Sequence, residues 1–78
     1  MSIELKISIL DGGIIHLTMR ENSKLSDLRL AIKNHTGIEE DEQRLIYLGR
    51  VLREDKLLTE YNIHSGVCIQ LVKAPVRK

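Results

Sequence analysis

One stretch of this chain has the apolar spacing of a helix, and this limits the fold more than any other feature of the sequence. In "ENSKLSDLRLAIKNHTG" (residues 21–37), four apolar residues recur at helical intervals: Leu25, Leu28, Ala31 and Ile32. The other apolar segments alternate with polar residues instead. Because one amphipathic helix covers only one face of a sheet, a fold built from these segments leaves the second face without a layer of its own.

Side-chain chemistry predicts where this helix begins and ends. Ser23 is the predicted N-cap, with a cap one residue later as the alternative, and Asp27 lies early enough to favour the positive end of the helix dipole. Gly37 stands where a helix ends in a left-handed residue. Leu30 falls off the apolar stripe, so we expect it to be an isolated surface leucine.

The remaining apolar segments have the period of strands. "IELKISIL" (3–10) alternates, and "DGG" links it to a second alternating run with Ile15, Leu17 and Met19, which predicts a hairpin. "QRLIYLGR" (43–50) is a third strand, "GRVL" a tight turn into a short fourth, and "VCIQLV" (67–72) the last. The predicted fold is α+β, with a mixed sheet of four to five strands and one helix packed across one face.

The connections between these segments are polar or irregular. Acidic residues 39–42 are interpreted as a solvated connector between the helix and the third strand. Residues 53–66 form a long loop, in which Leu58, Tyr61 and Ile63 are the predicted anchors to the core.

Size and composition exclude several classes of function. A chain of 78 residues forms one domain, and its net charge of +1 gives no electrostatic basis for binding nucleic acid or a membrane surface. The single cysteine, Cys68, cannot form an internal disulfide and fits a reducing compartment, so we expect a cytoplasmic or nuclear protein. The first ten residues lack the features of a signal peptide, and no apolar run is long enough to span a membrane.

The sequence contains no pattern of catalytic or metal-binding residues. His16, His35 and His64 are too scattered to match a zinc-binding spacing, so we expect no metal and no cofactor. The glycine pair that follows residue 11 is explained by a turn rather than by a phosphate-binding loop. Cys68 has no Cys-His signature, and an outward strand thiol without a base is the simpler interpretation. We therefore expect a binding protein rather than an enzyme.

Alternation along the strands predicts which residues remain on the uncovered face. If Leu45, Ile69 and Leu71 face the helix, the far face receives Arg44, Ile46, Leu48, Cys68, Gln70 and Val72. Ile46 and Val72, joined by Leu10 from the hairpin tip, would form an aliphatic cluster with a rim of Arg44, Arg50 and Gln70. An apolar centre with a basic and polar rim is typical of a protein-binding surface. The alternative is that these are singly exposed apolar residues, which are common on any surface.

Three segments together resemble ubiquitin and its ubiquitin-like relatives: "QRLIYLGRVL", "LTEYNIHSG" and "IQLV". The resemblance runs from Ile3 to Lys73 and includes the hairpin glycine Gly12 and the helix-ending Gly37. It implies a β-grasp fold for a ubiquitin-like domain of residues 1–73. The segments look most like the amino-terminal domains of ubiquilin-type shuttle proteins and of Scythe-type proteins.

The resemblance also implies where partners bind. In this family the recognition surface is centred on an isoleucine, a leucine and a valine at the positions of Ile46, Leu10 and Val72. Gly49 would let a partner approach the backbone, and Gln70 stands where many members have a histidine. Tyr61 matches a tyrosine whose hydroxyl ties down the long loop. The predicted protein-binding residues are Leu10, Arg44, Ile46, Leu48, Gly49, Arg50, Gln70 and Val72.

Two features depart from the pattern of a conjugated modifier. Such modifiers end in Gly-Gly, which their enzymes thread through a narrow slot, whereas this chain ends in "APVRK", where Pro75 removes a backbone donor. Arg50 takes the position of the best-known chain-linking lysine, and an arginine does not readily form an isopeptide bond. Residues 74–78 are therefore expected to begin a linker to the rest of a longer protein.

The resemblance thus predicts a monomeric, non-conjugated domain of the ubiquitin–proteasome pathway and of protein quality control. It would dock a larger protein onto ubiquitin-interacting motifs, ubiquitin-associated domains or proteasome receptor subunits. Two alternatives remain: a modifier whose Gly-Gly lies beyond Lys78, and an autoinhibitory domain that closes on its own chain.

Overall fold

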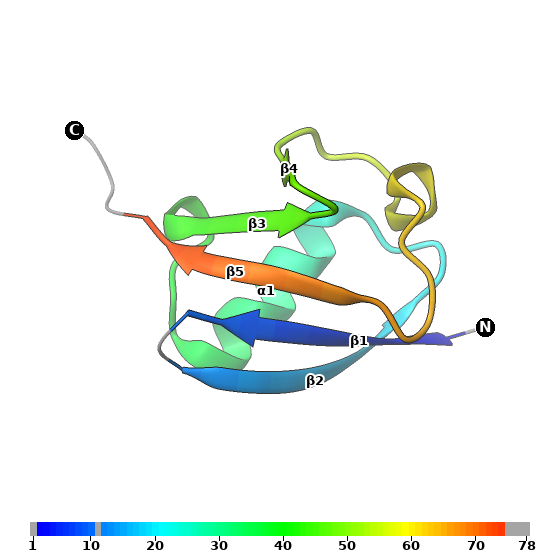
Figure 1. Ribbon diagram of the computed structural model, residues 1–78. Helices are drawn as coiled ribbons and strands as arrows, with labels where there is room; N and C mark the ends of the chain where they lie inside the picture. The colour runs from blue at the N-terminus through cyan, green and yellow to red at the C-terminus, as the bar shows by residue number, and fades with distance from the viewer. Residues whose placement is uncertain (1, 11, 75–78) are drawn as a thin grey trace.

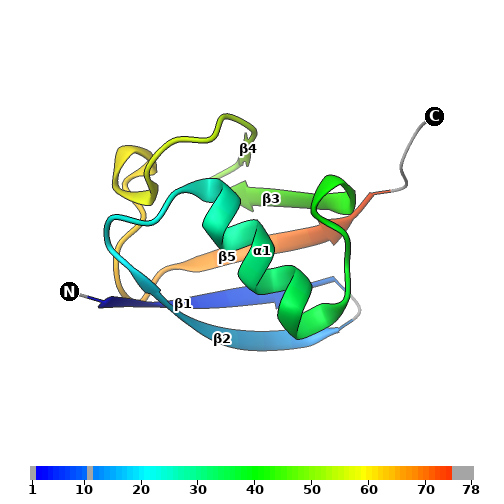
Figure 2. The same ribbon diagram turned by 180° about the vertical axis from the view of Figure 1, so that it is seen from behind.

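The computed structural model describes residues 2–10 and 12–74, which form a five-stranded mixed sheet with one α-helix across one face (Figures 1 and 2). The α+β prediction is confirmed. The elements are β1 (Ser2–Ile9), β2 (Gly13–Arg20), α1 (Leu25–Thr36), β3 (Gln43–Tyr47), β4 (Arg50–Leu52) and β5 (Cys68–Lys73), with 3₁₀ turns at Glu40–Glu42 and Leu58–Tyr61. Of the predicted linker, residues 75–78 lie outside the described part of the chain.

The strand order is β2-β1-β5-β3-β4, so the first and last strands lie side by side in the sheet. β1 and β5 run parallel, whereas β1 pairs with β2, β3 with β5 and β3 with β4 in antiparallel fashion. Figure 1 shows the sheet with α1 behind it, and Figure 2 shows α1 crossing the face that is turned away in Figure 1.

The core lies between α1 and one face of the sheet and is aliphatic. Alternate residues of each central strand point into it, as the period-two pattern predicts. The buried apolar residues are Ile3, Leu5, Ile7, Leu17, Leu25, Leu28, Ile32, Leu45, Leu52, Leu58, Ile63, Ile69 and Leu71. Leu30, predicted to lie off the stripe, is half exposed.

The start of α1 differs from the prediction that Ser23 caps the helix. The N-cap is Lys24, the alternative one residue later, and its backbone N–H donates to Oδ2 of Asp27 at 2.9 Å. Ser23 uses its backbone instead, since its carbonyl accepts a hydrogen bond from the N–H of Leu58 at 2.9 Å. The long loop therefore fixes the chain just before the helix, and Asp27 supplies the capping oxygen. The helix end is as predicted, with Gly37 at φ 79° and its N–H bonded to the Lys33 carbonyl.

The long loop is anchored as the sequence predicts. Leu58 and Ile63 are buried, and the Tyr61 hydroxyl donates to the Glu54 carbonyl. The acidic connector carries a short 3₁₀ turn in which Glu40 and Asp41 are exposed. Both connections leave the face of the sheet opposite α1 uncovered (Figure 1).

Candidate protein-binding surface

The open face is the face of the sheet that points away from α1, and strand pairing shows which residues share it. Ile46 of β3 lies opposite Gln70 of β5 and opposite Val51 of β4. Ser8 of β1 lies opposite Gln70 and opposite Ile14 of β2. Since paired residues point to the same side of a sheet, one cross-strand row runs through all five strands. In sheet order the row is Ile14, Ser8, Gln70, Ile46 and Val51.

The predicted apolar cluster, Leu10, Ile46 and Val72, is brought together on this face. The backbone N–H of Leu10 donates to the Leu71 carbonyl at 3.1 Å, which holds the hairpin tip beside the end of β5. Leu10 itself is 66% exposed, and Ile46 and Val72 are partly buried. Beside the row lies a shallow hollow of about 110 Å³, lined by Ser8, Leu10, Gln70, Leu71 and Val72.

Polar and basic groups border this cluster. Arg44 lies directly opposite Val72, and Gln70 lies opposite Ile46. Five of the predicted binding residues therefore share one surface: Leu10, Arg44, Ile46, Gln70 and Val72.

The other three predicted residues, Leu48, Gly49 and Arg50, lie at the turn between β3 and β4. β3 ends at Tyr47, and Leu48 and Gly49 take φ values of 52° and 77°, so strand alternation stops before Leu48. Leu48 is 80% exposed. Arg50 pairs with Tyr47, which packs against the core, and not with Ile46. The structure thus places these residues beside the cluster but not within it.

A second hollow, of about 330 Å³, lies next to this turn. Leu48 and Arg50 line it together with Tyr47, Leu52, Glu60, Tyr61 and Asn62. The Tyr47 hydroxyl reaches the Asn62 carbonyl at 3.4 Å across it. Leu48 and Arg50 therefore border a different depression from the one that Leu10 and Val72 line.

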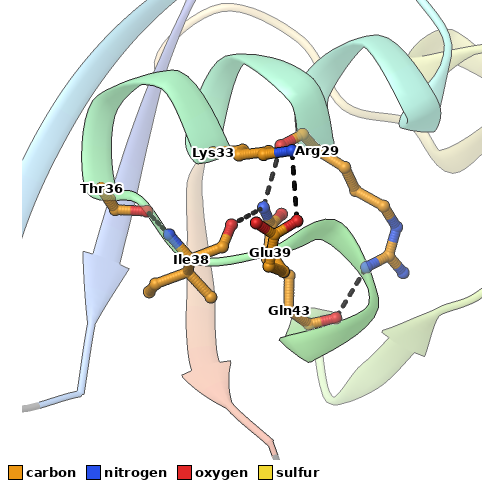
Figure 3. A network of polar contacts seen from close by, with 6 residues as sticks. All are labelled: Arg29, Lys33, Thr36, Ile38, Glu39 and Gln43. Carbon is orange, nitrogen blue, oxygen red and sulfur yellow. Dashed lines mark hydrogen bonds and ion pairs between the residues drawn. The ribbon is translucent and has the colours of Figure 1, made fainter. Parts of the chain in front are cut away.

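A polar network fixes the start of β3, and with it the position of Arg44 and Ile46. The buried amide of Gln43 donates from Nε2 to the carbonyls of Arg29 and Ile38 at 2.9 and 3.1 Å (Figure 3). The Arg29 guanidinium donates to the carbonyls of Glu40, Gln43 and Leu52 at 3.1, 2.6 and 3.0 Å. These bonds join α1 to β3 and β4.

Further contacts in the same region close the segment between α1 and β3. The Thr36 hydroxyl donates to the Ile32 carbonyl. It also accepts from the Ile38 N–H, and Lys33 pairs with Glu39 at 3.1 Å (Figure 3). Neither Arg29 nor Gln43 was predicted from the sequence to have a role. Gln43 is a polar residue at an inward-facing strand position, and a buried polar side chain needs hydrogen-bond partners. This position could have predicted the network.

The charged residues on the open face are mostly basic. The register places Lys6 opposite His16 and Cys68, and it places Arg44 opposite Val72. Arg20 lies at the end of β2 on the same side, and Glu4 is the acidic residue that shares this face among the described strand residues. The acidic residues 39–42 lie between α1 and β3, directly before the strand that carries Arg44.

The groups whose pKa values depart from their usual range lie away from this face. A hydrogen bond from Lys56 lowers the pKa of Glu54, and the same pair raises the pKa of Lys56. The backbone N–H of Ser26 lowers the pKa of Asp55, whose carboxylate it contacts at 2.9 Å. Glu54 and Lys56 pair within the long loop, whereas Asp55 joins that loop to the start of α1.

Among residues 2–10 and 12–74, no group of three or more His, Cys, Asp and Glu side chains is placed to hold a metal ion. Cys68 is a free, exposed thiol on β5. In the same ranges, no helix has the length and apolar character needed to cross a membrane.

Two apolar residues of the open face were missed in the sequence analysis. Ile14, which is 57% exposed, and Val51 lie at opposite ends of the cross-strand row. Alternation along residues 13–20 already places Ile14 on the side of His16. Val51 could be assigned only from its pairing with Ile46, which the sequence does not specify.

Comparisons with known proteins agree with this architecture. The model of the ubiquitin family matches residues 3–75. The chain is 37% identical over 73 residues to the large proline-rich protein bag6-A of Xenopus laevis, covering 94% of this chain and 6% of that protein. It is 33% identical over 70 residues to ubiquitin-like protein 1 of Schizosaccharomyces pombe, covering 90% of each.

Solved structures show the same fold. The ubiquitin-like domain of Plasmodium falciparum Dsk2 superposes with a TM-score of 0.89, covering 95% of this chain and all of that one at 24% identity. The predicted β-grasp fold is confirmed. This chain spans a small part of the length of the frog protein.

Proposed function

The chain belongs to the ubiquitin family, and from that premise we propose that it is a non-conjugated domain that docks a larger protein onto ubiquitin-binding partners. These partners are ubiquitin-interacting motifs, ubiquitin-associated domains or proteasome receptor subunits. The domain acts by binding rather than by catalysis, within the ubiquitin–proteasome pathway and protein quality control, in the cytoplasm or the nucleus.

The observation that carries this proposal is the uncovered apolar cluster on the open face. Leu10, Ile46 and Val72 come from a turn and two strands, and no described segment of the chain packs over them. Exposed aliphatic residues that converge in this way, with Arg44 and Gln70 at the border, have the make-up of a protein-binding surface.

The size of the cluster implies a weak and reversible interaction. A shallow surface of this kind buries less than a standard interface, so most of its binding energy comes from a few central residues. Ile46 lies in the middle of the cross-strand row, and its truncation to alanine is expected to cost about 2 kcal/mol of binding free energy. Arg44 would steer an acidic partner and raise the association rate more than it lowers the dissociation rate.

An NMR titration of the ¹⁵N-labelled domain with a synthetic ubiquitin-interacting helix of a proteasome receptor tests this function. We expect chemical-shift changes to concentrate at Ile46, Gln70 and Val72, and the Ile46→Ala variant to bind about 30-fold more weakly. Leu30→Ala is the matched control, because Leu30 is an exposed aliphatic residue on α1. Unchanged signals at Ile46 and Val72 would contradict the proposal.

The same proposal places the domain in a longer protein. The match to the frog protein covers 94% of this chain but only 6% of that protein. Residues 74–78 would then begin a linker. Expression of the complete gene product, followed by immunoblotting with an antibody against this domain, should give one band far above 8.9 kDa.

One observation favours a second candidate, a conjugated modifier. Ubiquitin-like protein 1 of fission yeast is matched over 90% of its length, so a relative of nearly this size exists. A modifier requires a Gly-Gly terminus encoded beyond Lys78. The coding sequence downstream of that residue, together with ATP-dependent transfer of the processed protein to an activating enzyme, distinguishes the two candidates.

A further inference from the structure

The two edges of the sheet differ in how well they are protected against pairing with another strand. The order β2-β1-β5-β3-β4 makes β2 and β4 the edge strands. A free edge offers unpaired backbone N–H and C=O groups, and short strands, proline, lysine or bulges usually block it. β4 (Arg50–Leu52) is blocked by its length, because it contains three residues. β2 (Gly13–Arg20) contains eight, so its edge needs another form of protection.

β2 has none of these other protections. Its sequence, "GIIHLTMR", contains neither proline nor lysine. Its pairing with β1 runs without a bulge from Ser2 opposite Arg20 to Ile9 opposite Gly13. Both views of the fold show β2 at the margin of the molecule, with no described segment beyond it (Figures 1 and 2). A long, regular strand therefore leaves its outer edge open.

The covered side of β2 is also incompletely buried. Ile15, Leu17 and Met19 pair with buried residues of β1 and therefore share the face that α1 covers. Leu17 is buried, whereas Ile15 and Met19 are partly buried against the core. A strand added beside β2 would remove more of these two side chains from water, and burial of apolar surface favours association.

We propose that the edge of β2 pairs with β2 of a second copy of the chain, so that two five-stranded sheets become one continuous sheet. Two identical antiparallel strands pair about a two-fold axis, and the same residues contribute on both sides. Directly opposite residues point to the same side of a sheet, so the axis passes beside one residue rather than between two. The domain is then a dimer, in contrast to the monomer that its resemblance to ubiquitin predicts.

Charge indicates which residue lies at the axis. When the axis passes beside Leu17, His16 of one copy lies opposite Thr18 of the other, and Ile14 lies opposite Arg20. Within β2, no basic side chain then lies opposite another. The exposed side of the joined strands therefore carries no directly opposed charges.

The same register continues the apolar layer on the covered side. Leu17 lies beside its own counterpart, and Ile15 lies opposite Met19 of the other copy. Moving the axis by one residue places His16 opposite His16 in one direction and opposite Arg20 in the other. Like charges that lie directly opposite each other oppose pairing, so the axis beside Leu17 is favoured. These matches come from β2 itself, and they favour a second copy over an unrelated strand.

Pairing about this axis has a consequence for docking. The two-fold axis is perpendicular to the sheet, so the open faces of both copies point to the same side of the dimer. A partner with two binding helices would contact both copies, and its second contact would be intramolecular, which raises the overall affinity. This consequence rests on the proposed function, whereas the pairing of β2 does not.

Dilution of the ¹⁵N-labelled wild-type domain from millimolar to micromolar concentration tests the pairing. We expect the amide signals of β2 to shift with concentration, and sedimentation equilibrium to detect a dimer at the higher concentrations. The signals of Ile46 and Val72 should stay constant, because β3 and β5 lie away from this edge. Constant β2 signals up to millimolar concentration would overturn the inference.

Two double variants test the register. Within one copy, Lys6 lies opposite His16 and Glu4 lies opposite Thr18. His16→Glu with Thr18→Lys gives opposite charges in both of these pairs, and it also places the new acid opposite the new base of the other copy. The affinity of the dimer should therefore rise about fivefold. His16→Lys with Thr18→Lys opposes like charges across the interface and should weaken the dimer about as much. Both positions are exposed, and the amide spectrum verifies that each variant folds.

Leu30→Ala is the control, because Leu30 is exposed on α1, and it should leave the dimer unchanged. The weakened variant should still bind the ubiquitin-interacting helix through Ile46, so failure of the pairing and failure of the proposed function are distinguishable. If His16→Glu with Thr18→Lys weakens the dimer, the proposed register is wrong. A lysine-flanked peptide of alternating threonine and valine serves as an unrelated strand. If it shifts the β2 signals while the wild type stays monomeric, the edge accepts a foreign strand and the pairing of two copies is overturned.

Discussion

The two faces of the sheet are made by the same strands, yet they differ in what their side chains can contribute. Leu45 and Ile46 are neighbours on β3, and Leu45 is fully buried under α1 whereas Ile46 lies on the open face. The covered face is aliphatic along its centre. The open face mixes aliphatic, polar and basic groups. In a chain of this size, the period of the strand separates residues that stabilise the fold from residues that remain free to bind.

This separation depends on strand register. A shift of β3 by one residue would exchange Leu45 and Ile46 between the faces and bring Arg44 under the helix. The buried Gln43 amide and the Arg29 guanidinium hold the start of β3 against α1 through backbone carbonyls. The polar network on the covered face therefore holds β3 in the register that places Ile46 on the open face.

The largest expected effect comes from truncating neighbouring residues on opposite faces. Leu45→Ala should lower the free energy of unfolding by about 3 kcal/mol, because it leaves a cavity in a fully buried site. Ile46→Ala should lower it by about 1 kcal/mol while removing most peptide binding. Urea denaturation and NMR titration of both variants measure the contrast. Equal losses of stability would show that Ile46 also belongs to the core.

A smaller effect is expected from the polar network. Arg29→Ala removes the guanidinium that donates hydrogen bonds to three backbone carbonyls, so it should lower the free energy of unfolding by about 2 kcal/mol. Arg29→Lys should recover only part of this loss. Urea denaturation measures both. Because these bonds hold the start of β3, the peptide affinity of the folded Arg29→Ala variant should also fall. An affinity equal to that of the wild type would mean that the open face keeps its arrangement without them.

A substitution in the turn between β3 and β4 should raise stability rather than lower it. Leu48 has a φ of 52°, a conformation that costs most side chains about 1 kcal/mol and suits asparagine or glycine. Because its side chain is 80% exposed, Leu48→Asn loses little packing, and its melting temperature should rise. Calorimetry of the variant beside the wild type tests this. A fall in melting temperature would show that Leu48 packs against the neighbouring hollow.

The smallest effect is a change of stability with pH, and it arises in the long loop beside the start of α1. The pKa of Asp55 lies below its ordinary value of 3.8, because the Ser26 N–H bonds its charged form. A lowered folded pKa means that this contribution to stability is present above the unfolded value and disappears as the pH falls through the folded one. Asp55→Asn should therefore be less stable than the wild type near neutral pH, and the gap should close at acid pH.

Urea denaturation at a series of pH values measures this gap. Glu54→Gln should behave in the same way, since Lys56 lowers the pKa of Glu54. A gap that persists unchanged into strong acid would mean that the Asp55 charge has no part in holding the start of α1.

The sequence was sufficient to predict the strands and α1, but not the two 3₁₀ turns or the bonds that hold the elements together. Alternation and helical spacing placed the strands, α1 and the ending at Gly37. Ser23 was predicted as the N-cap with the next residue as the alternative, and the cap is Lys24, whose N–H donates to Asp27. The chain before it is held by Leu58, which lies more than thirty positions away in the printed sequence and bonds the Ser23 carbonyl. Local capping preferences carry no information about such a bond.

The binding residues, too, were predicted correctly within strands and less well at turns. Residues within strands, such as Ile46 and Val72, were assigned to the open face by alternation alone. Leu48 was assigned by extending that alternation past the end of β3, where the positive φ of the turn stops it. Val51 was missed because its face depends on register across the turn, which only the pairing with Ile46 reveals.

The parallel pairing of β1 and β5 has a mechanical consequence. Since these two strands run in the same direction side by side, Ser2 and Lys73 lie toward opposite ends of the sheet. Traction applied between them loads the hydrogen bonds of this pair in shear, all at once, instead of peeling them one after another. A domain pulled between these two ends must therefore break the bonds of this strand pair together.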